Sequence, residues 1–249
     1  MFDGLFVYLF RIRGYGGRRI SHFTIFLMPL FYQHTINEYT KLGIWQIEEA
    51  ETFFTGKVPL KRDVSHPHKR LQHLAGRFLL PALFPDFPLE EIVIADTRKP
   101  FLENEKYHFS ISHCGDFAAA IVSSRNRVGV DIELITPKIE RIRHKFLEEN
   151  EYHLAKTNWP LSTNKTADAT ASDQSLQTLL WSAKESIYKW FGEGLVDFRQ
   201  HMQLNQPLFS DDQDWINAHF VFRKYDKVDL TVKSRFFDEL VLAYVVSKE

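Results

Sequence analysis

Residues 128–134 constrain the fold of this chain most tightly, because their sequence, VGVDIEL, alternates apolar residues with small or acidic ones. Successive side chains of a β-strand point to opposite faces. A strand here would have one apolar face and a second face made of Gly129, Asp131 and Glu133. The two carboxylates would stand roughly 7 Å apart, which is unfavourable unless they share a cation. The segment predicts a metal-binding strand in which Gly129 leaves room for a ligand; an edge strand with a solvated acidic face is the alternative.

A second motif, WSAKESIYK, occupies residues 181–189. It falls in a helix predicted over residues 179–191, which ends at Gly192 and Gly194. Glu185 and Lys189 are four residues apart and therefore share one helix face. An ordinary surface pair of this kind contributes only about 0.2–0.5 kcal/mol and is the alternative interpretation. Trp181 on the same stripe and the two following glycines favour a functional site.

A third motif, SISHCGD, spans residues 110–116. A strand that ends in small hydrogen-bonding side chains and a histidine suits an anion or a phosphate, although a plain turn between two strands has the same pattern. Basic residues cluster near it in the sequence: Lys57, Lys61, Arg62, Lys69, Arg70, Arg77, Arg98 and Lys99. If they are not simply solvated surface charges, they would complement a substrate that carries several phosphates.

Composition excludes several classes of protein. The 249 residues include 31 basic and 32 acidic side chains, so no general nucleic-acid-binding charge is present. A single cysteine, Cys114, rules out a disulfide framework and favours a reducing, cytoplasmic location. No apolar run reaches the roughly 18 residues of a membrane-spanning helix, and we expect neither a nucleic-acid nor a membrane partner.

The first 27 residues differ from the rest, with four arginines and one aspartate. Arg18 and Arg19 followed by an aromatic stretch resemble a secretion signal or a membrane-surface anchor. However, His22 and Thr24 interrupt the apolar run. We favour a third interpretation, in which Met28 is the true start and residues 1–27 are an extension of little structural meaning.

Hydrophobic periodicity predicts an α+β fold with two similar lobes, residues 28–128 and 129–249. The lobes would be separated from one another at the acidic strand. The predicted helices cover residues 67–80, ending before Pro81, then 139–155 and 179–191. The predicted strands cover residues 43–47, 107–111, 117–123, 127–134, 219–225, 228–234 and 240–247. A polar stretch at 157–178 is predicted to be a surface loop.

In this order, the motifs Lys99-Pro100, Ser110-Ile111-Ser112-His113, Gly129-Val130-Asp131-Ile132-Glu133 and Trp181-Ser182-x-Lys184-Glu185-x-x-x-Lys189 resemble those of the 4′-phosphopantetheinyl transferases. The resemblance is to the larger, surfactin-synthetase-activating type, and it covers about Met28 to the C-terminus. It implies a monomer with two similar halves and an active site between them. It implies magnesium-dependent transfer of the phosphopantetheine arm of coenzyme A to a serine of an acyl or peptidyl carrier protein. The second product would be 3′,5′-ADP, and the pathway fatty-acid, polyketide or nonribosomal peptide biosynthesis.

The resemblance also assigns roles to individual residues. It implies that Asp131, Glu133 and Glu185 bind magnesium and that Lys189 lies near the reacting phosphate. The implied contacts with coenzyme A are Lys99, Pro100, Ser112 and His113, together with Arg70 and Arg77 in a basic helix. Glu151 matches an accessory acidic position. We expect Glu185, directly or through a metal-bound water, to take the proton from the carrier serine while Lys189 stabilises charge on the phosphate.

Two alternatives remain open at this point. The same carboxylates would serve another magnesium-dependent enzyme that acts on a nucleotide pyrophosphate. A non-catalytic module that binds coenzyme A or a carrier protein is the second; it would be expected to lack one of Asp131, Glu133, Glu185 and Lys189, and none is missing. Because carrier proteins are acidic around their serine, a basic and apolar surface should receive them, and the 157–178 stretch is expected to border it.

Overall fold

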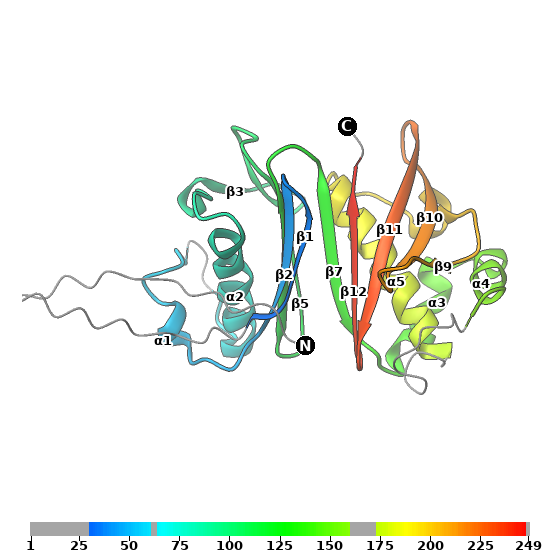
Figure 1. Cartoon of the computed structure of the whole chain (residues 1–249), viewed down its shortest axis with the longest axis horizontal. Coiled ribbons are helices and arrows are strands. Elements are labelled where there is room, and N and C mark those ends of the chain that lie inside the picture. Colours follow the sequence, from blue (N-terminus) through cyan, green and yellow to red (C-terminus); the bar gives the residue numbers. More distant parts are fainter. Residues whose placement is uncertain (1–29, 61–63, 160–172, 248–249) are drawn as a thin grey trace, which may run out of the picture.

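The computed structural model describes residues 30–60, 64–159 and 173–247. The predictions for residues 1–27 and for Met28 lie outside these ranges, as do Lys61, Arg62 and the central part of the 157–178 stretch. Figure 1 shows four layers side by side: the long helix α2 (Pro67–Leu83), a first sheet, a second sheet, and a helical layer around α5 (Asp173–Phe191). The mixed α+β class predicted from the sequence is confirmed.

The first sheet is antiparallel and has the strand order β1-β2-β6-β5. Its strands are β1 (Leu30–Asn37), β2 (Thr40–Gln46), β5 (His108–Cys114) and β6 (Phe117–Ser123). The remaining elements of this half are α1 (Glu51–Phe54), a 3-10 turn (Leu89–Glu91) and the hairpin of β3 (Ile92–Ile94) with β4 (Pro100–Leu102). Helix α2 covers one face of the sheet through a core that includes Leu74, Leu79, Phe109 and Val122.

Helix α2 does not stop before Pro81, as predicted, but continues to Leu83. A proline inside a helix removes one backbone hydrogen bond and strains the preceding turn. Here Leu80 and Leu83 are almost completely buried against the sheet. The apolar burial of this last turn outweighs the lost hydrogen bond.

The second sheet has the strand order β7-β12-β11-β10-β8, and β9 pairs with β10. Its strands are β7 (Val128–Leu134), β8 (Met202–Leu204), β9 (Phe209–Ser210), β10 (Ile216–Arg223), β11 (Lys227–Phe237) and β12 (Leu240–Val246). The helices of this half are α3 (Lys138–Phe146), α4 (Glu149–Lys156), α5 and α6 (Phe198–His201). None of the described helices is long and apolar enough to cross a membrane.

Two helix predictions in this half were wrong. The segment predicted as one helix over residues 139–155 is two helices, because Leu147 is extended and Glu148 caps the start of α4 through a capping box with Glu151. Helix α5 begins at Asp173, within the stretch predicted to be a surface loop. Its first turns read as polar, but Leu176 is fully buried there.

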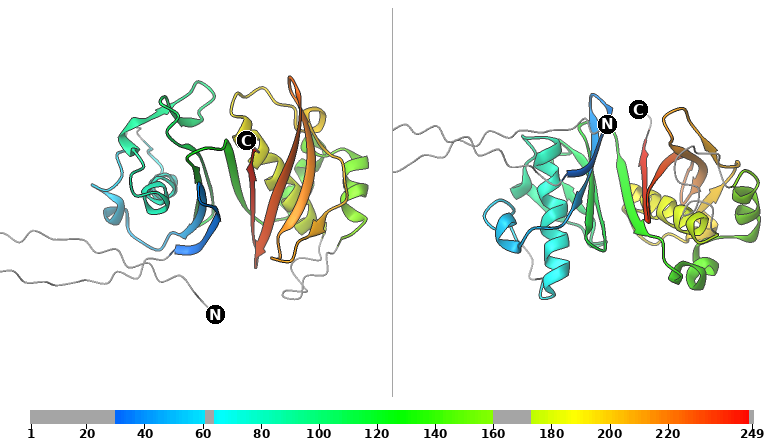
Figure 2. Two further views of the ribbon diagram at one scale, coloured as in Figure 1. Left: turned by 45° about the horizontal axis from the view of Figure 1, so that its top comes forward. Right: turned by 60° about the horizontal axis from the view of Figure 1, so that its bottom comes forward.

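The two sheets pack face to face, which Figure 2 shows from two further directions. Val128, Val130 and Ile132 of β7 point into the interface core, against residues of β2 and β6. The edges of β5 and β7 also meet, without backbone pairing. The backbone N–H groups of Val130, Ile132 and Leu134 donate instead to side chains of β5, at 3.2 Å to Ser110 Oγ, 3.3 Å to Ser112 Oγ and 3.3 Å to Cys114 Sγ. This ladder fixes the register of β7 against the first sheet.

The opposite face of β7 packs directly on α5. A Cβ atom at Gly129 would lie 2.0 Å from the carbonyl oxygen of Ser186 and 2.7 Å from the backbone nitrogen of Trp190. Gly129 therefore allows the helix backbone to approach the strand. The prediction that Gly129 leaves space for a ligand was wrong, because α5 fills that space.

Replacing Gly129 with alanine should destabilise the protein by about 3 kcal/mol, since neither backbone can move aside easily. Urea unfolding would measure the loss. Gly43→Ala is a matched control in β2, where a Cβ would meet side chains at an ordinary 3.4 Å and should cost less than about 1 kcal/mol. Equal stabilities for the two variants would contradict this account of Gly129.

Candidate active site

Asp131 lies at the centre of the site, on the face of β7 that meets α5. Only 2% of it is exposed. Its Oδ1 accepts hydrogen bonds from Lys189 Nζ at 2.6 Å and from Ser112 Oγ at 2.8 Å. Its Oδ2 is buried and has no hydrogen-bond partner among the described residues. An unpartnered buried carboxylate oxygen is costly, and a cation or a donor on a ligand would satisfy it.

Glu133 is the second carboxylate of the strand. Its Oε1 accepts a hydrogen bond from Trp181 Nε1 at 3.0 Å, and Cys114 Sγ lies 3.6 Å from its Oε2. Burial raises the pKa of Glu133, and the negative charge of Asp131 raises it further. The mutual repulsion predicted from the sequence is therefore present. Trp181 therefore orients Glu133. This hydrogen bond explains why an aromatic residue with an N–H donor occupies this position of α5.

Glu185 projects from α5 near the two strand carboxylates. Burial raises its pKa to about 7, and the charges of Asp131 and Glu133 act in the same direction. Lys189, one turn further along the helix, opposes the shift. A carboxylate with a pKa near neutrality is suited to accepting a proton from a substrate.

The three carboxylates differ from a complete metal centre. Among the described residues, no three carboxylate, imidazole or thiol side chains converge closely enough to hold an ion by themselves. Magnesium, however, takes one or two protein carboxylates and keeps waters and substrate phosphates as its other ligands. The carboxylate oxygens of this cluster, including the unpartnered Asp131 Oδ2, fit such an incomplete set of magnesium ligands.

Two adjoining pockets lie beside this cluster, and Lys189 rather than any of the three carboxylates lines one of them. One is lined by His73, Arg77, Arg98 and His113 together with apolar residues of the β3–β4 region. The other is lined by Arg98, Pro100, Ser110 and Lys189 among others. Both pockets have Arg98, Pro100 and Ile111 in their walls, so they adjoin, and together they reach from the basic side of α2 to the lysine beside Asp131. We call this pair of adjoining pockets the path.

His113, one of the two histidines that line the path, does not carry a fixed positive charge. Enclosure lowers the pKa of His113, and Lys189 and Lys69 contribute to the same shift. The neutral ring can hydrogen-bond a ligand and become protonated when an anion arrives.

Not every residue expected at a coenzyme A site lies on this path. Arg77, Pro100 and His113 line it, whereas Arg70 donates to both carboxylate oxygens of Glu51, at 2.8 and 2.7 Å. Ser112 is buried and uses its hydroxyl on Asp131 and the strand backbone. Lys99 lines the second pocket, but its Nζ donates to a backbone carbonyl of α5.

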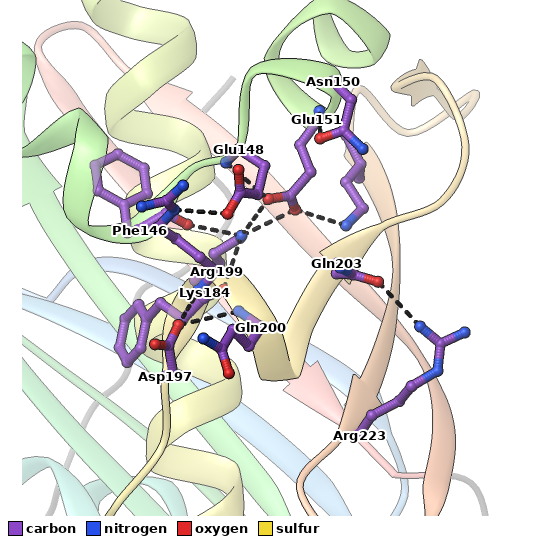
Figure 3. Close-up of polar contacts among 12 residues, drawn as sticks. Phe146, Glu148, Asn150, Glu151, Lys184, Asp197, Arg199, Gln200, Gln203 and Arg223 are labelled. Atoms are coloured by element: carbon purple, nitrogen blue, oxygen red, sulfur yellow. Dashed lines mark hydrogen bonds and ion pairs between the residues drawn. The ribbon is translucent and has the colours of Figure 1, made fainter.

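Lys184, which precedes Glu185, is fully buried and forms an ion pair with Glu151 at 2.9 Å. Its Nζ also donates to the carbonyl oxygens of Phe146 at 2.8 Å and Phe198 at 3.0 Å. Figure 3 shows Lys184 with Phe146 and Glu151 around its amino group. Burial lowers the pKa of Lys184, while Glu151 raises it. Glu151 is thus the buried partner of a lysine in this structure, and its second oxygen accepts the backbone N–H of Leu204.

Sequence reasoning missed three contributors to the site. Arg98 was predicted only as one of several nearby basic residues and His73 was not predicted at all; the two line one pocket because residues of the β3–β4 hairpin and of α2 face each other across it. The Lys184–Glu151 pair joins residues 33 positions apart. The only signal of this pair in the sequence was Glu151, the acidic residue before Tyr152.

The fold and the site together define an α+β protein in which acidic residues of a strand meet a lysine and a basic pocket at the junction of two sheets. A sequence model of the 4′-phosphopantetheinyl transferase superfamily matches residues 127–245. The 4′-phosphopantetheinyl transferase AcpT of Salmonella typhimurium (strain LT2) is 30% identical over 149 residues, which cover 58% of this chain and 71% of that protein. The chain therefore belongs to the 4′-phosphopantetheinyl transferase superfamily.

Other relatives agree with this membership. AcpT of Escherichia coli (strain K12) is 32% identical over 136 residues, covering 53% of this chain and 64% of that relative. The 4′-phosphopantetheinyl transferase gsp of Aneurinibacillus migulanus is 30% identical over 124 residues, covering 49% of this chain and 46% of its own length. These two matches each span less than two thirds of the relative.

Proposed function

We propose that this protein transfers the 4′-phosphopantetheine group of coenzyme A to a serine of an acyl or peptidyl carrier protein. The serine Oγ forms a bond to the β-phosphorus of coenzyme A, and the bond from that phosphorus to the bridging oxygen breaks. The second product is then 3′,5′-ADP. The observation that carries the proposal is the pair of adjoining pockets that reaches from the basic residues of α2 to Lys189, whose Nζ lies 2.6 Å from Asp131 Oδ1.

The lining of the path suits coenzyme A. Arg77, Arg98 and His113 offer donors and positive charge to the phosphates, and Pro100 and Ile111 offer apolar surface to the nucleoside. Lys189, which lines the inner end, would contact the pyrophosphate and stabilise the charge that develops on it. In this arrangement the 3′-phosphate lies toward α2 and the reacting phosphorus toward Asp131.

Asp131, Glu133 and Glu185 would hold a magnesium ion together with oxygens of the pyrophosphate. When bound, the ion neutralises charge on the pyrophosphate and on the departing ADP. Glu185 would accept the proton of the serine hydroxyl. Its high pKa in the metal-free protein reflects burial among like charges. A bound magnesium ion would lower this pKa and keep the carboxylate ionised, which is the form that accepts a proton.

Intact-mass measurement tests the activity directly. The full chain is incubated with coenzyme A, magnesium and a purified apo carrier protein, and the mass of the carrier is followed. Attachment of the whole phosphopantetheine arm supports the proposal. Cleavage of coenzyme A without a change in carrier mass would support a pyrophosphate-cleaving enzyme instead, and tight binding of coenzyme A with neither reaction would support a non-catalytic module. Running several carriers in parallel identifies the pathway served.

The exposed side of α3 is the proposed receiving surface for the carrier. Lys138, Arg141, His144 and Lys145 are exposed along it, and none of the four forms an ion pair within the described residues. Helix α3 follows directly after β7, so this basic surface lies close to Glu133. An acidic partner would be attracted to it.

Reversing two of these charges, with Arg141→Glu and Lys145→Glu, should raise the KM for the carrier at least about tenfold and leave the KM for coenzyme A unchanged. The matched control is Lys227→Glu, a reversal at the exposed start of β11. Steady-state kinetics at low and high salt would measure both, because salt weakens the wild-type interaction more than that of the double variant. An equal response of the control would contradict a docking role for α3.

A further inference from the structure

The turn between β3 and β4 reaches across to the C-terminal end of α5. Thr97 Oγ1 donates a hydrogen bond to the carbonyl oxygen of Gly192 at 2.9 Å, and Lys99 Nζ donates to the carbonyl oxygen of Trp190 at 3.2 Å. The last four carbonyls of a helix have no partner within the helix, and a positive charge at this end is favourable. A turn of the first half of the chain therefore caps the helix that carries Glu185 and Lys189.

Two glycines make this close approach possible. A Cβ atom at Gly192 would lie 2.3 Å from Lys99 Cδ, and one at Gly194 would lie 3.2 Å from Thr97 Cγ2. Both glycines have positive φ angles, 76° and 75°. Lys99 is thus packed against the end of α5 along the length of its side chain. Burial lowers its pKa to about 8, with Arg127 contributing.

The cap lies one to three residues from Lys189. Lys189 belongs to the last turn of α5, which ends at Phe191, and its Nζ has to reach Asp131 at 2.6 Å. The final turn of a helix frays most easily when its carbonyls have no partner. Fraying would move Lys189 without disturbing Arg77 or His113 on the other side of the path.

We propose that Lys99 is a positioning residue that holds the last turn of α5, and with it Lys189, in place, with Thr97 as a second and weaker clamp. This differs from the direct contact with coenzyme A that the sequence resemblance implies for Lys99. The inference rests on the proposed transfer function for its kinetic consequence. The capping itself can be tested without activity.

Three variants separate the two roles of this turn. Lys99→Met should lower kcat about tenfold by loosening Lys189, while the affinity for coenzyme A, measured by calorimetry without a carrier, stays within about threefold of wild type. Thr97→Val should lower kcat in the same direction by a smaller factor. Arg98→Met, in the same turn but on the pocket wall, should show the opposite pattern, with weakened coenzyme A binding. A large loss of coenzyme A affinity in Lys99→Met with kcat retained at saturation would overturn the proposal.

Amide hydrogen exchange supplies a readout that does not depend on the reaction. Residues 188–192 should exchange faster in Lys99→Met and Thr97→Val than in wild type, whereas residues 176–183, in the first half of α5, should be unchanged. Unchanged exchange at 188–192 would overturn the positioning role even if the enzyme is active. If wild type transfers no phosphopantetheine but the exchange pattern is as expected, the proposed function fails and the capping role stands.

Discussion

Replacing Glu185 with glutamine is expected to lower kcat about a thousandfold, because the variant loses the group that accepts the proton of the carrier serine. Glutamine keeps the size of the side chain, so α5 and the pocket should retain their structure. The affinity for coenzyme A, measured without magnesium, should stay within about threefold of wild type. Intact-mass kinetics at saturating coenzyme A and carrier would measure the loss. Full activity in the variant would remove Glu185 from the reaction.

The same substitution should change how stability depends on pH in the metal-free protein. The pKa of Glu185 is raised to about 7 in the folded state from an ordinary value of 4.5. As pH rises from 4.5, the unfolded carboxyl ionises first, so wild type loses stability until about pH 7. Glu185→Gln lacks this loss and should be more stable than wild type above pH 7, by about 3 kcal/mol. The difference should vanish near pH 4.

Thermal unfolding with a chelator across this pH range would measure the difference. Adding magnesium should stabilise wild type more than Glu185→Gln, because an ion shared with Asp131 relieves the repulsion that raises the pKa. Asp131→Asn serves as the matched control, since it removes a neighbouring charge and leaves the Glu185 carboxyl in place. A pH dependence identical in wild type and Glu185→Gln would contradict the shifted pKa.

Breaking the buried Lys184–Glu151 pair should have the largest effect on stability. Either Lys184→Met or Glu151→Gln is expected to lower the free energy of unfolding by about 3–5 kcal/mol, because it leaves one charge buried without its counterion. Urea unfolding would measure the loss. Lys184 is 0% exposed and Glu151 2%, so solvent cannot compensate for the missing partner.

The double variant distinguishes a charge effect from a packing effect. Lys184→Met with Glu151→Gln removes both charges, and the glutamine oxygen can still accept the Leu204 N–H that Glu151 binds at 2.8 Å. The double variant should therefore be less destabilised than the sum of the singles, by at least about 2 kcal/mol. The nearby pair of Arg199 and Glu148, 44% and 37% exposed, is the control, and Arg199→Ala should cost under about 1 kcal/mol. Additive losses in the double variant would contradict the account.

The hydrogen bonds of Lys184 also hold α5 in position near the active site. Lys184 joins the helix to the ends of α3 and α6 through the carbonyls of Phe146 and Phe198. It is the residue immediately before Glu185. The buried pair therefore fixes the part of α5 that carries Glu185, just as the cap at Trp190 fixes the part that carries Lys189.

Short-range patterns predicted much of the fold. The alternation of residues 128–134 identified β7 and its apolar face, since side chains in a strand alternate whatever the rest of the chain does. The end of α5 at Gly192 was also predicted, because a glycine with positive φ is the usual stop for a helix. Gly192 has a positive φ in the structure. The errors at Pro81, at Leu147 and at Asp173 arose where burial or a distant partner overrode the local signal.

The sequence by itself singled out most of the candidate site residues, because the spacing of carboxylates, lysine and histidine is a local property of the strand and the helix. Only the tertiary structure decided what each residue touches. It placed α5 in the space beside Gly129. It paired Lys184 with Glu151 and Arg70 with Glu51. It also brought Lys99 into contact with the C-terminal end of α5. These contacts join residues far apart in the chain. They depend on how two sheets and two long helices pack, and periodicity within a segment carries no information about that packing.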